Sequence, residues 1–111
     1  MLETLSTPRG TFEHLDEVQL VDCRERSEWD AGRVEGSIHL PLNAIMAGAG
    51  TDLDHSKPVV VICRSGNRSE LATMMFQARG FVAYNMDGGI EAWAHEGLPF
   101  SAPDGSPGRV A

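Results

Sequence analysis

The sequence has no run of basic residues and few cations of any kind. Its 111 residues include 9 Lys and Arg against 16 Asp and Glu, which gives a formal net charge of −7. Proteins that bind nucleic acids use clustered cations to neutralise phosphates. We therefore expect no nucleic-acid partner.

Long apolar stretches are missing as well. No segment approaches the roughly 20 apolar residues that a membrane-spanning helix needs. The first ten residues lack the charged start and the apolar centre of a signal peptide. We expect a cytoplasmic protein that does not bind a membrane.

Cysteine is scarce, since the chain contains only Cys23 and Cys63. Two cysteines are too few for a disulfide framework, and they lack the paired spacing of a zinc site. The histidines are scattered without the i, i+4 spacing of two metal ligands on one helix. They are His14, His39, His55 and His95. We expect no metal ion.

Strand-like and helix-like patterns alternate along the chain. Strand patterns cover residues 18–23, 37–41, 58–63 and 82–86, and helix patterns cover 8–15, 25–31, 42–48, 69–79 and 90–96. The segment 58–63 is apolar without alternation, as in a central strand of a parallel sheet that is covered on both faces. Right-handed crossovers predict an α/β fold with a mostly parallel sheet of about five strands and helices on both faces.

The chain is long enough for one domain, which we place at residues 1–100. Residues 101–111 are rich in Ser, Pro and Gly, which predicts a disordered tail. Within the domain, we expect Gly32 to end the helix 25–31 as a left-handed cap, and Trp29 and Trp93 to be core anchors. The helix 69–79 has an apolar stripe that we expect to face the core. The stripe consists of Leu71, Met74, Met75 and Ala78.

The central strand pattern ends at Cys63, and a polar loop follows it. The loop residues are Arg64, Ser65, Gly66, Asn67, Arg68 and Ser69. A parallel sheet binds ligands at the carboxyl ends of its strands. A helix N-terminus or a nearby arginine lowers the pKa of a cysteine from about 8.5 to roughly 3.5–7.5. We therefore predict a reactive thiolate at Cys63, and the alternative is that Cys63 is merely a small buried hydrophobic residue.

Two features are predicted to shape this loop. Gly66 permits a backbone turn that aims successive N–H groups at an anion. Asn67 and Glu70 have the spacing of a capping box, which predicts that a helix starts here with its positive end toward the sulfur.

Three segments together resemble the rhodanese-type sulfurtransferases. CRSGNRS, residues 63–69, resembles their active-site loop, in which a cysteine and an arginine enclose four residues. LVDCRERSEWDAGRVEGSIHLPL, residues 20–42, resembles their Asp-x-Arg-Glu and Glu-aromatic motifs. MDGGIEAWAHEGLPF, residues 86–100, resembles their Gly-Gly-x-x-x-Trp and Gly-x-Pro ending. The motifs occur in the family's order across residues 18–100, which implies a rhodanese-like fold.

The resemblance implies that Cys63 takes sulfane sulfur from a small anionic donor such as thiosulfate. The resulting persulfide passes the sulfur to a thiol or cyanide, and a thioredoxin-like protein is one candidate acceptor. No metal or organic cofactor is implied. Arg68 would shape the loop, Arg64 would attract the donor, and Asp22 and Arg24 would support the loop from the neighbouring strand.

The sequence departs from the family pattern at several positions. Arg33, Glu35 and His39 replace common residues on the surface that would meet the acceptor. Cys23 stands where an aliphatic residue is usual. In the implied fold the strands before Cys23 and Cys63 are parallel neighbours, so Cys23 is a candidate resolving thiol under oxidant or after sulfur loading. Alternatively, Cys23 only replaces the aliphatic side chain.

Two other functions compete with sulfur transfer. Cysteine phosphatases and arsenate reductases that resemble rhodanese have a loop one residue longer, and the four residues between Cys63 and Arg68 favour sulfur over phosphate. A rhodanese-like regulatory or protein-binding module often lacks the cysteine, so the presence of Cys63 argues against this function.

Overall fold

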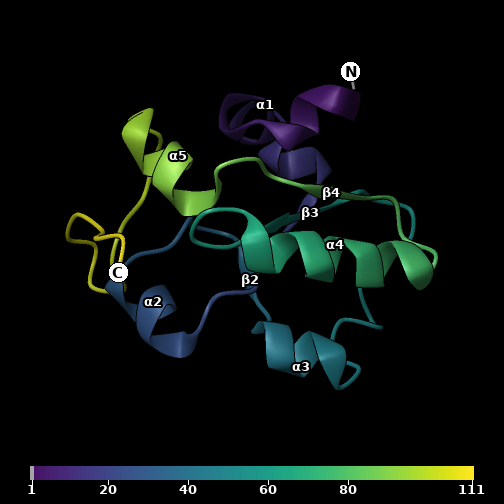
Figure 1. Cartoon of the computed structure of the whole chain (residues 1–111). Helices are drawn as coiled ribbons and strands as arrows, with labels where there is room; N and C mark the ends of the chain where they lie inside the picture. Colours follow the sequence, from purple (N-terminus) through teal and green to yellow (C-terminus); the bar gives the residue numbers. More distant parts are fainter. Residues whose placement is uncertain (1) are drawn as a thin grey trace.

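The computed structural model describes residues 2–111 and contains one parallel sheet between two layers of helices (Figure 1). The elements are, in chain order, η1 Leu2–Ser6, α1 Pro8–Glu13, η2 Leu15–Glu17, β1 Gln19–Asp22, α2 Arg26–Ala31, β2 Ile38–His39, α3 Leu42–Met46, β3 Val59–Ile62, α4 Asn67–Ala78, β4 Ala83–Asn85 and α5 Gly89–His95. Here η denotes a short 3₁₀ helix. None of these described helices is long and apolar enough to cross a bilayer.

The strands lie in the order β2-β1-β3-β4, and each pairs with its neighbours in parallel. β3 is therefore an inner strand, as its unbroken apolar sequence predicted. All four of its residues are fully buried. The predicted α/β fold with a parallel central sheet and helices on both faces is confirmed.

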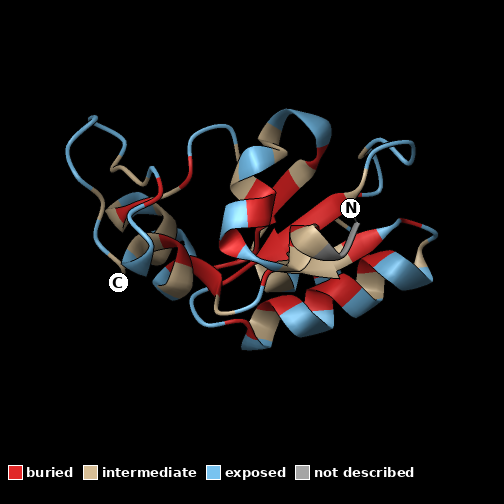
Figure 2. Cartoon of the chain, turned by 90° about the horizontal axis from the view of Figure 1, so that it is seen from above, coloured by how far each residue is buried: buried red, intermediate tan, exposed pale blue. Residues whose placement is uncertain are grey.

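Alternate strand residues feed two separate cores, one on each face of the sheet. Leu20, Val60 and Ile62 face α1 and α5, and Trp93 completes this core with no exposed surface. On the other face, the core residues of β1 and β3 pack with α3 and α4. They are Val21, Val59 and Val61, together with both cysteines, Cys23 and Cys63, which follow the strand ends. Figure 2 shows that burial is concentrated in the strands and on the inner sides of the helices.

The apolar stripe predicted for the helix 69–79 was wrong by two positions. The residues of α4 that face the sheet are Ser69, Ala72, Thr73 and Phe76. Leu71 and Met74 are instead 43% and 59% exposed. The short loop after β3 fixes the rotation of α4, because it brings the Ser69 hydroxyl to 3.3 Å from the Cys63 sulfur. Three small residues and Phe76 then line the face that lies on the strands.

The predicted left-handed cap at Gly32 was also wrong. Gly32 has φ 169° and ψ 146°, which is extended backbone. Glycine is required there for space, because a Cβ would lie 2.6 Å from the ring of Phe100 and 2.9 Å from the backbone nitrogen of Arg109. A left-handed glycine instead follows α4, where Gly80 has φ +91°.

Residues 101–111, for which the composition predicts disorder, lie against α2 and the segment after it (Figure 1). Ser101 exchanges two backbone hydrogen bonds with Arg33, and the N–H of Arg109 donates to the carbonyl of Ala31 at 2.9 Å. Val110 packs on the core between the sheet and α5. These contacts involve backbone groups and one apolar side chain, and amino-acid composition does not predict such contacts.

Candidate active site

Cys63 directly follows β3, and its side chain is only 1% exposed. The backbone N–H of Gly66 donates a hydrogen bond to its Sγ at 3.0 Å. Gly66 has φ +108°, a left-handed conformation that favours glycine. This conformation lets the chain turn back within three residues and point an N–H group at the sulfur.

The carbonyl groups of Cys63 and Arg64 point away from the sulfur, toward α5. The N–H groups of Ile90 and Glu91 donate to the carbonyl oxygens of Cys63 and Arg64, at 2.8 and 3.0 Å. Gly89 permits this contact, because a Cβ there would lie 2.4 Å from the Cys63 carbonyl oxygen. Since α5 binds the carbonyls, the loop N–H groups are free to face an anion at the sulfur.

A serine and an asparagine complete the surroundings of the sulfur. The Ser69 Oγ lies 3.3 Å from the Cys63 Sγ and 2.5 Å from the Asn85 Oδ1. The Asn85 Nδ2 donates to the Gly66 carbonyl at 3.1 Å, which turns its oxygen toward Ser69. The hydroxyl has one hydrogen, so Asn85 competes with the sulfur for it.

The two loop arginines have different surroundings. Arg68 makes two parallel hydrogen bonds to Glu28 of α2, at 2.7 and 2.9 Å, which ties the loop to that helix. Arg64 is about half exposed and lies 3.4 Å from Glu91. Ser65 and Asn67 of the loop are exposed.

The expected capping box at Asn67 was wrong, because α4 begins at Asn67 itself and Gly66 occupies the cap position. A reciprocal capping box is found instead at the start of α2, between Glu25 and Glu28. Glu28 therefore holds the start of α2 through the Glu25 N–H and the loop through Arg68. One carboxylate thus joins two segments that are 40 residues apart.

Asp22 and Arg24 form a buried ion pair at the end of β1, and neither side chain is exposed. The Arg24 Nε and Nη2 donate to the Asp22 carboxylate at 2.8–3.0 Å, and Nη2 also donates to the Gly32 carbonyl at 2.7 Å. The backbone N–H of Arg24 donates to the same carboxylate at 3.0 Å. The pair fixes the chain from the end of β1 to the end of α2, beside the Cys63 loop.

The groups around the Cys63 sulfur lower the pKa of its thiol to about 4. The largest cause is a hydrogen bond from the Cys23 thiol; burial acts in the opposite direction, and the Ser69 hydroxyl and the N–H groups of Ser69 and Gly66 lower the pKa further. The hydrogen bond to Cys63 and burial raise the pKa of Cys23 well above its usual range. At neutral pH the pair therefore consists of a Cys63 thiolate and a Cys23 thiol.

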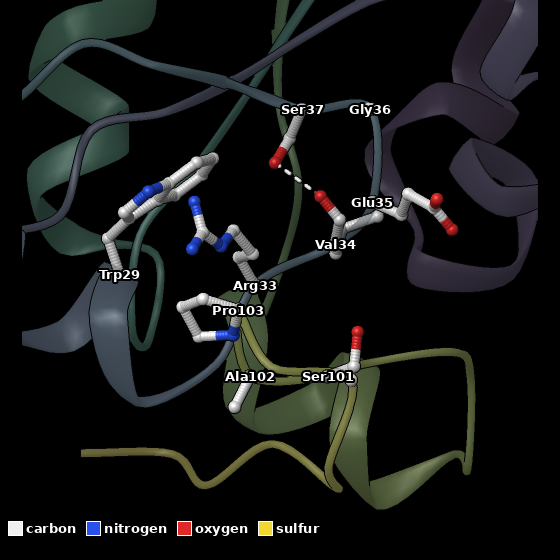
Figure 3. Close-up of a pocket in the computed structure, with 10 residues that line it drawn as sticks. Trp29, Arg33, Val34, Glu35, Gly36, Ser37, Ser101, Ala102 and Pro103 are labelled. Atoms are coloured by element: carbon white, nitrogen blue, oxygen red, sulfur yellow. Dashed lines mark hydrogen bonds between the residues drawn. The ribbon is translucent and has the colours of Figure 1, made fainter.

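The indole of Trp29 lies outside the core, so its assignment as a core anchor was wrong, whereas that of Trp93 was right. α2 is short and has no fully buried residue. Trp29 stacks on His39 with ring centroids 4.6 Å apart, and the Arg33 guanidinium lies 4.4 Å from its centre. Trp29 and Arg33 line a pocket of about 430 Å³, together with residues 34–37, 101–103 and 105 (Figure 3).

Three residues of the site were not predicted from the sequence. Glu28 belongs to the Glu-aromatic motif, and its charge opposite to that of Arg68 was the available signal. Asn85 is a polar residue at the end of a strand pattern, which is where a parallel sheet places its ligands. Gly89 is part of the quoted Gly-Gly motif, but its packing beneath the loop depends on how α5 is placed.

Comparisons with known proteins agree on one family. A family model described as "Rhodanese-like domain" matches residues 11–96. A protein named "Sulfurtransferase" from Allochromatium vinosum is 36% identical over 91 residues, which cover 81% of this chain and 84% of that protein. A "Putative sulfurtransferase YtwF" from Bacillus subtilis is 36% identical over 84 residues, which cover 76% of this chain and 81% of that protein.

Among solved structures, a rhodanese-related protein from Thermoplasma volcanium superimposes with a TM-score of 0.80. It is 28% identical in sequence, and the match covers 86% of this chain and 94% of that chain. The similarity therefore extends over nearly the whole of both folds.

Proposed function

The chain belongs to the rhodanese-like domain family, and from this membership we propose that it is a sulfurtransferase that carries sulfane sulfur as a persulfide on Cys63. The observation that carries the proposal is the hydrogen bond from the Gly66 N–H to the Cys63 Sγ, at 3.0 Å. A neutral thiol that merely fills a core has no need of a donor aimed at it. The names of both curated relatives support the same function.

The proposed first step is attack of the Cys63 thiolate on the outer sulfur of thiosulfate. A bond forms between the Cys63 Sγ and the outer sulfur, and the sulfur–sulfur bond of thiosulfate breaks, with its electron pair leaving on sulfite. In the second step cyanide or a thiolate attacks the terminal sulfur of the persulfide, and Cys63 departs as a thiolate. Such two-step covalent catalysis needs an ionised nucleophile, which the low pKa of Cys63 supplies.

The loop has the charge and shape for these steps. Negative charge lies on the thiolate and then on the persulfide, and the N–H groups of Gly66 and Ser69 face it. Arg64 is exposed at the rim, where a cation attracts an anionic donor. Arg68 acts through Glu28, by holding the loop on α2.

The proposal includes the setting in which the protein works. The donor is a small sulfur anion, the acceptor is cyanide, a thiol or a thioredoxin-like protein, and neither step calls for a metal or organic cofactor. We place the protein in the cytoplasm, where free cysteines stay reduced. Both of its cysteines are free.

One pair of assays tests the proposal against its rivals. The protein is given thiosulfate and cyanide, and thiocyanate is measured; in parallel it is given an aryl phosphate, and phenol release is measured. Thiocyanate formation without phosphate hydrolysis is the expected result. Hydrolysis without sulfur transfer would indicate a phosphatase, and inactivity in both assays would indicate a binding module.

A further inference from the structure

The two cysteines occupy matching positions at the ends of neighbouring strands. β1 and β3 are parallel, with Asp22 paired to Ile62, and Cys23 and Cys63 are the next residues on each strand. The N–H of Cys23 continues the ladder by donating to the Ile62 carbonyl at 2.9 Å. Adjacent strands lie about 4.8 Å apart, which is within the Cα separation of roughly 4.4–6.8 Å that a disulfide requires.

Both side chains also point to the same face of the sheet. Val21 and Val61, two residues earlier on each strand, belong to the same core as the two cysteines. Alternation along the strands therefore places the two sulfurs side by side, and each thiol shifts the pKa of the other. The sequence alone left open whether Cys23 faces the opposite side, and the structure excludes that arrangement.

Cys23 is enclosed, with 1% of its side chain exposed. The thiol within its reach is that of Cys63, which follows the paired strand and belongs to the same core. In the native state Cys23 is protonated, because its hydrogen bond to Cys63 and its burial raise its pKa.

We propose that Cys23 is a resolving thiol that discharges the persulfide on Cys63 as hydrosulfide when no external acceptor is present. This inference rests on the proposed function. The Cys23 proton passes to the terminal sulfur of the persulfide, and the Cys23 thiolate so formed attacks the Sγ of Cys63. A Cys23–Cys63 disulfide forms, the bond from Sγ to the terminal sulfur breaks, and the protonated terminal sulfur leaves with the electron pair of that bond, so the persulfide anion and one thiol become a disulfide and HS⁻.

The electrons balance within the protein, because the two cysteine sulfurs are oxidised to a disulfide while the sulfane sulfur is reduced to sulfide. Return to the starting state requires a dithiol, such as dithiothreitol or a thioredoxin-like protein. One turnover would therefore release sulfide and consume one dithiol. External acceptors and Cys23 compete for the same persulfide, so the acceptor concentration decides which product appears.

The test installs the persulfide chemically, so that it does not depend on thiosulfate as donor. Reduced protein is treated with inorganic polysulfide, desalted and held without acceptor or reductant. Released hydrosulfide is measured, and peptides are mapped by mass spectrometry under non-reducing conditions. We expect one HS⁻ for each Cys23–Cys63 disulfide peptide.

Cys23→Ser is the matched variant, because serine keeps a hydrogen-bond donor of similar size at this position but is a poor nucleophile. We expect HS⁻ release to slow by at least ~10-fold in this variant, since the intramolecular thiol is gone, and the persulfide peptide of Cys63 to persist. If Cys23→Ser does not fold, the disulfide peptide of the wild-type protein decides the question by itself.

A wild-type persulfide that is stable, or that releases HS⁻ without forming the Cys23–Cys63 disulfide, would overturn the inference. Equal release rates in the wild type and Cys23→Ser would do the same. Failure of the proposed function looks different, because thiocyanate formation from thiosulfate would then be absent while the disulfide still forms from the polysulfide-loaded protein.

Discussion

The neighbouring strands β1 and β3 are each followed by a cysteine. The turns after the two strands nevertheless stabilise different anions. After β3, the Gly66 N–H points at the Cys63 sulfur. After β1, the Arg24 N–H points at the Asp22 carboxylate, and the Arg24 guanidinium binds it as well. Each turn stabilises one negative charge at a strand end.

The difference lies in what neutralises that charge. The Asp22 carboxylate has a buried guanidinium as its partner, so it is fully paired and structural. The Cys63 thiolate is surrounded by neutral hydrogen-bond donors, from Cys23, Ser69 and Gly66. Its electron pairs therefore stay available to attack the sulfur-donating substrate. The comparison suggests that an anion held by neutral hydrogen-bond donors is reactive, whereas one held by a buried cation is a support.

The largest expected effect is on the β3 side. We expect Cys63→Ser to lower thiocyanate formation by at least ~10³-fold, because serine nearly matches cysteine in size but is un-ionised at neutral pH. The melting temperature, followed by circular dichroism, should change by only a few degrees. Transfer within about tenfold of the wild type would show that another group is the nucleophile.

The matching change on the β1 side should affect stability. Asp22→Asn leaves the buried Arg24 guanidinium without its carboxylate, and breaking a buried pair in this way costs about 3–5 kcal/mol. The Arg24 Nη1 already has no hydrogen-bond partner among the described residues. Urea denaturation measures the loss.

Asp30→Asn is the control for this change, because it removes the partner of the exposed Arg26. An exposed pair contributes about 0–1 kcal/mol. Equal losses in Asp22→Asn and Asp30→Asn would mean that the buried pair does not support the strand end.

Two glycines test whether α5 supports the Cys63 loop. Gly89 is the first residue of α5, and Gly97 follows its C-terminal end. Gly89 and Gly97 both have positive φ, at 59° and 72°, but a Cβ at Gly97 meets open space, whereas a Cβ at Gly89 meets the Cys63 carbonyl. We expect Gly97→Ala to cost roughly 1–2 kcal/mol for the left-handed backbone. Gly89→Ala should cost a further 1–3 kcal/mol for overpacking.

Only Gly89→Ala should also slow the alkylation of Cys63, because it displaces the loop from α5. Urea denaturation and an alkylation time course separate the two effects. Identical behaviour of both variants would argue that α5 does not hold the loop.

The smallest effect concerns the charge of Arg68. Arg68→Ala removes a cation near Cys63 and should raise the pKa of the thiol, by roughly 1 unit. The rise is limited because Glu28 already pairs with Arg68. Arg26→Ala removes an exposed arginine of α2 that does not contact the loop and serves as the control. The midpoint of thiolate absorbance against pH reports the shift. Equal midpoints in both variants would show that the charge of Arg68 does not change the pKa of Cys63.

Much of this architecture could be predicted from the sequence, because its signals were local. The apolar run before Cys63 predicted an inner parallel strand, and the polar loop with Gly66 predicted a turn that faces an anion. The positions of β3 and Gly66 follow from the backbone conformations that individual residues prefer.

The errors came from contacts that the residue pattern does not show. The rotation of α4 depends on the contact of Ser69 with Cys63 across the short loop, so the exposed Leu71 and Met74 were assigned to the core. Glycine is needed at position 32 because the aromatic ring of Phe100, from the far end of the chain, occupies the space where a Cβ would lie. Glu28 and Asn85 reach the loop from α2 and β4, and neither approach is visible in the local pattern.

The pKa of Cys63, read residue by residue, tests the central claim most directly. Reduced protein is alkylated with iodoacetamide at a series of pH values, and mass spectrometry assigns the rate to each cysteine. Because the rate follows the thiolate fraction, it should rise as the pH passes about 4 and stay level between about pH 6 and pH 8, with Cys23 unmodified. A rate at Cys63 that climbs about tenfold per pH unit up to pH 8, as for an ordinary thiol, would contradict the account.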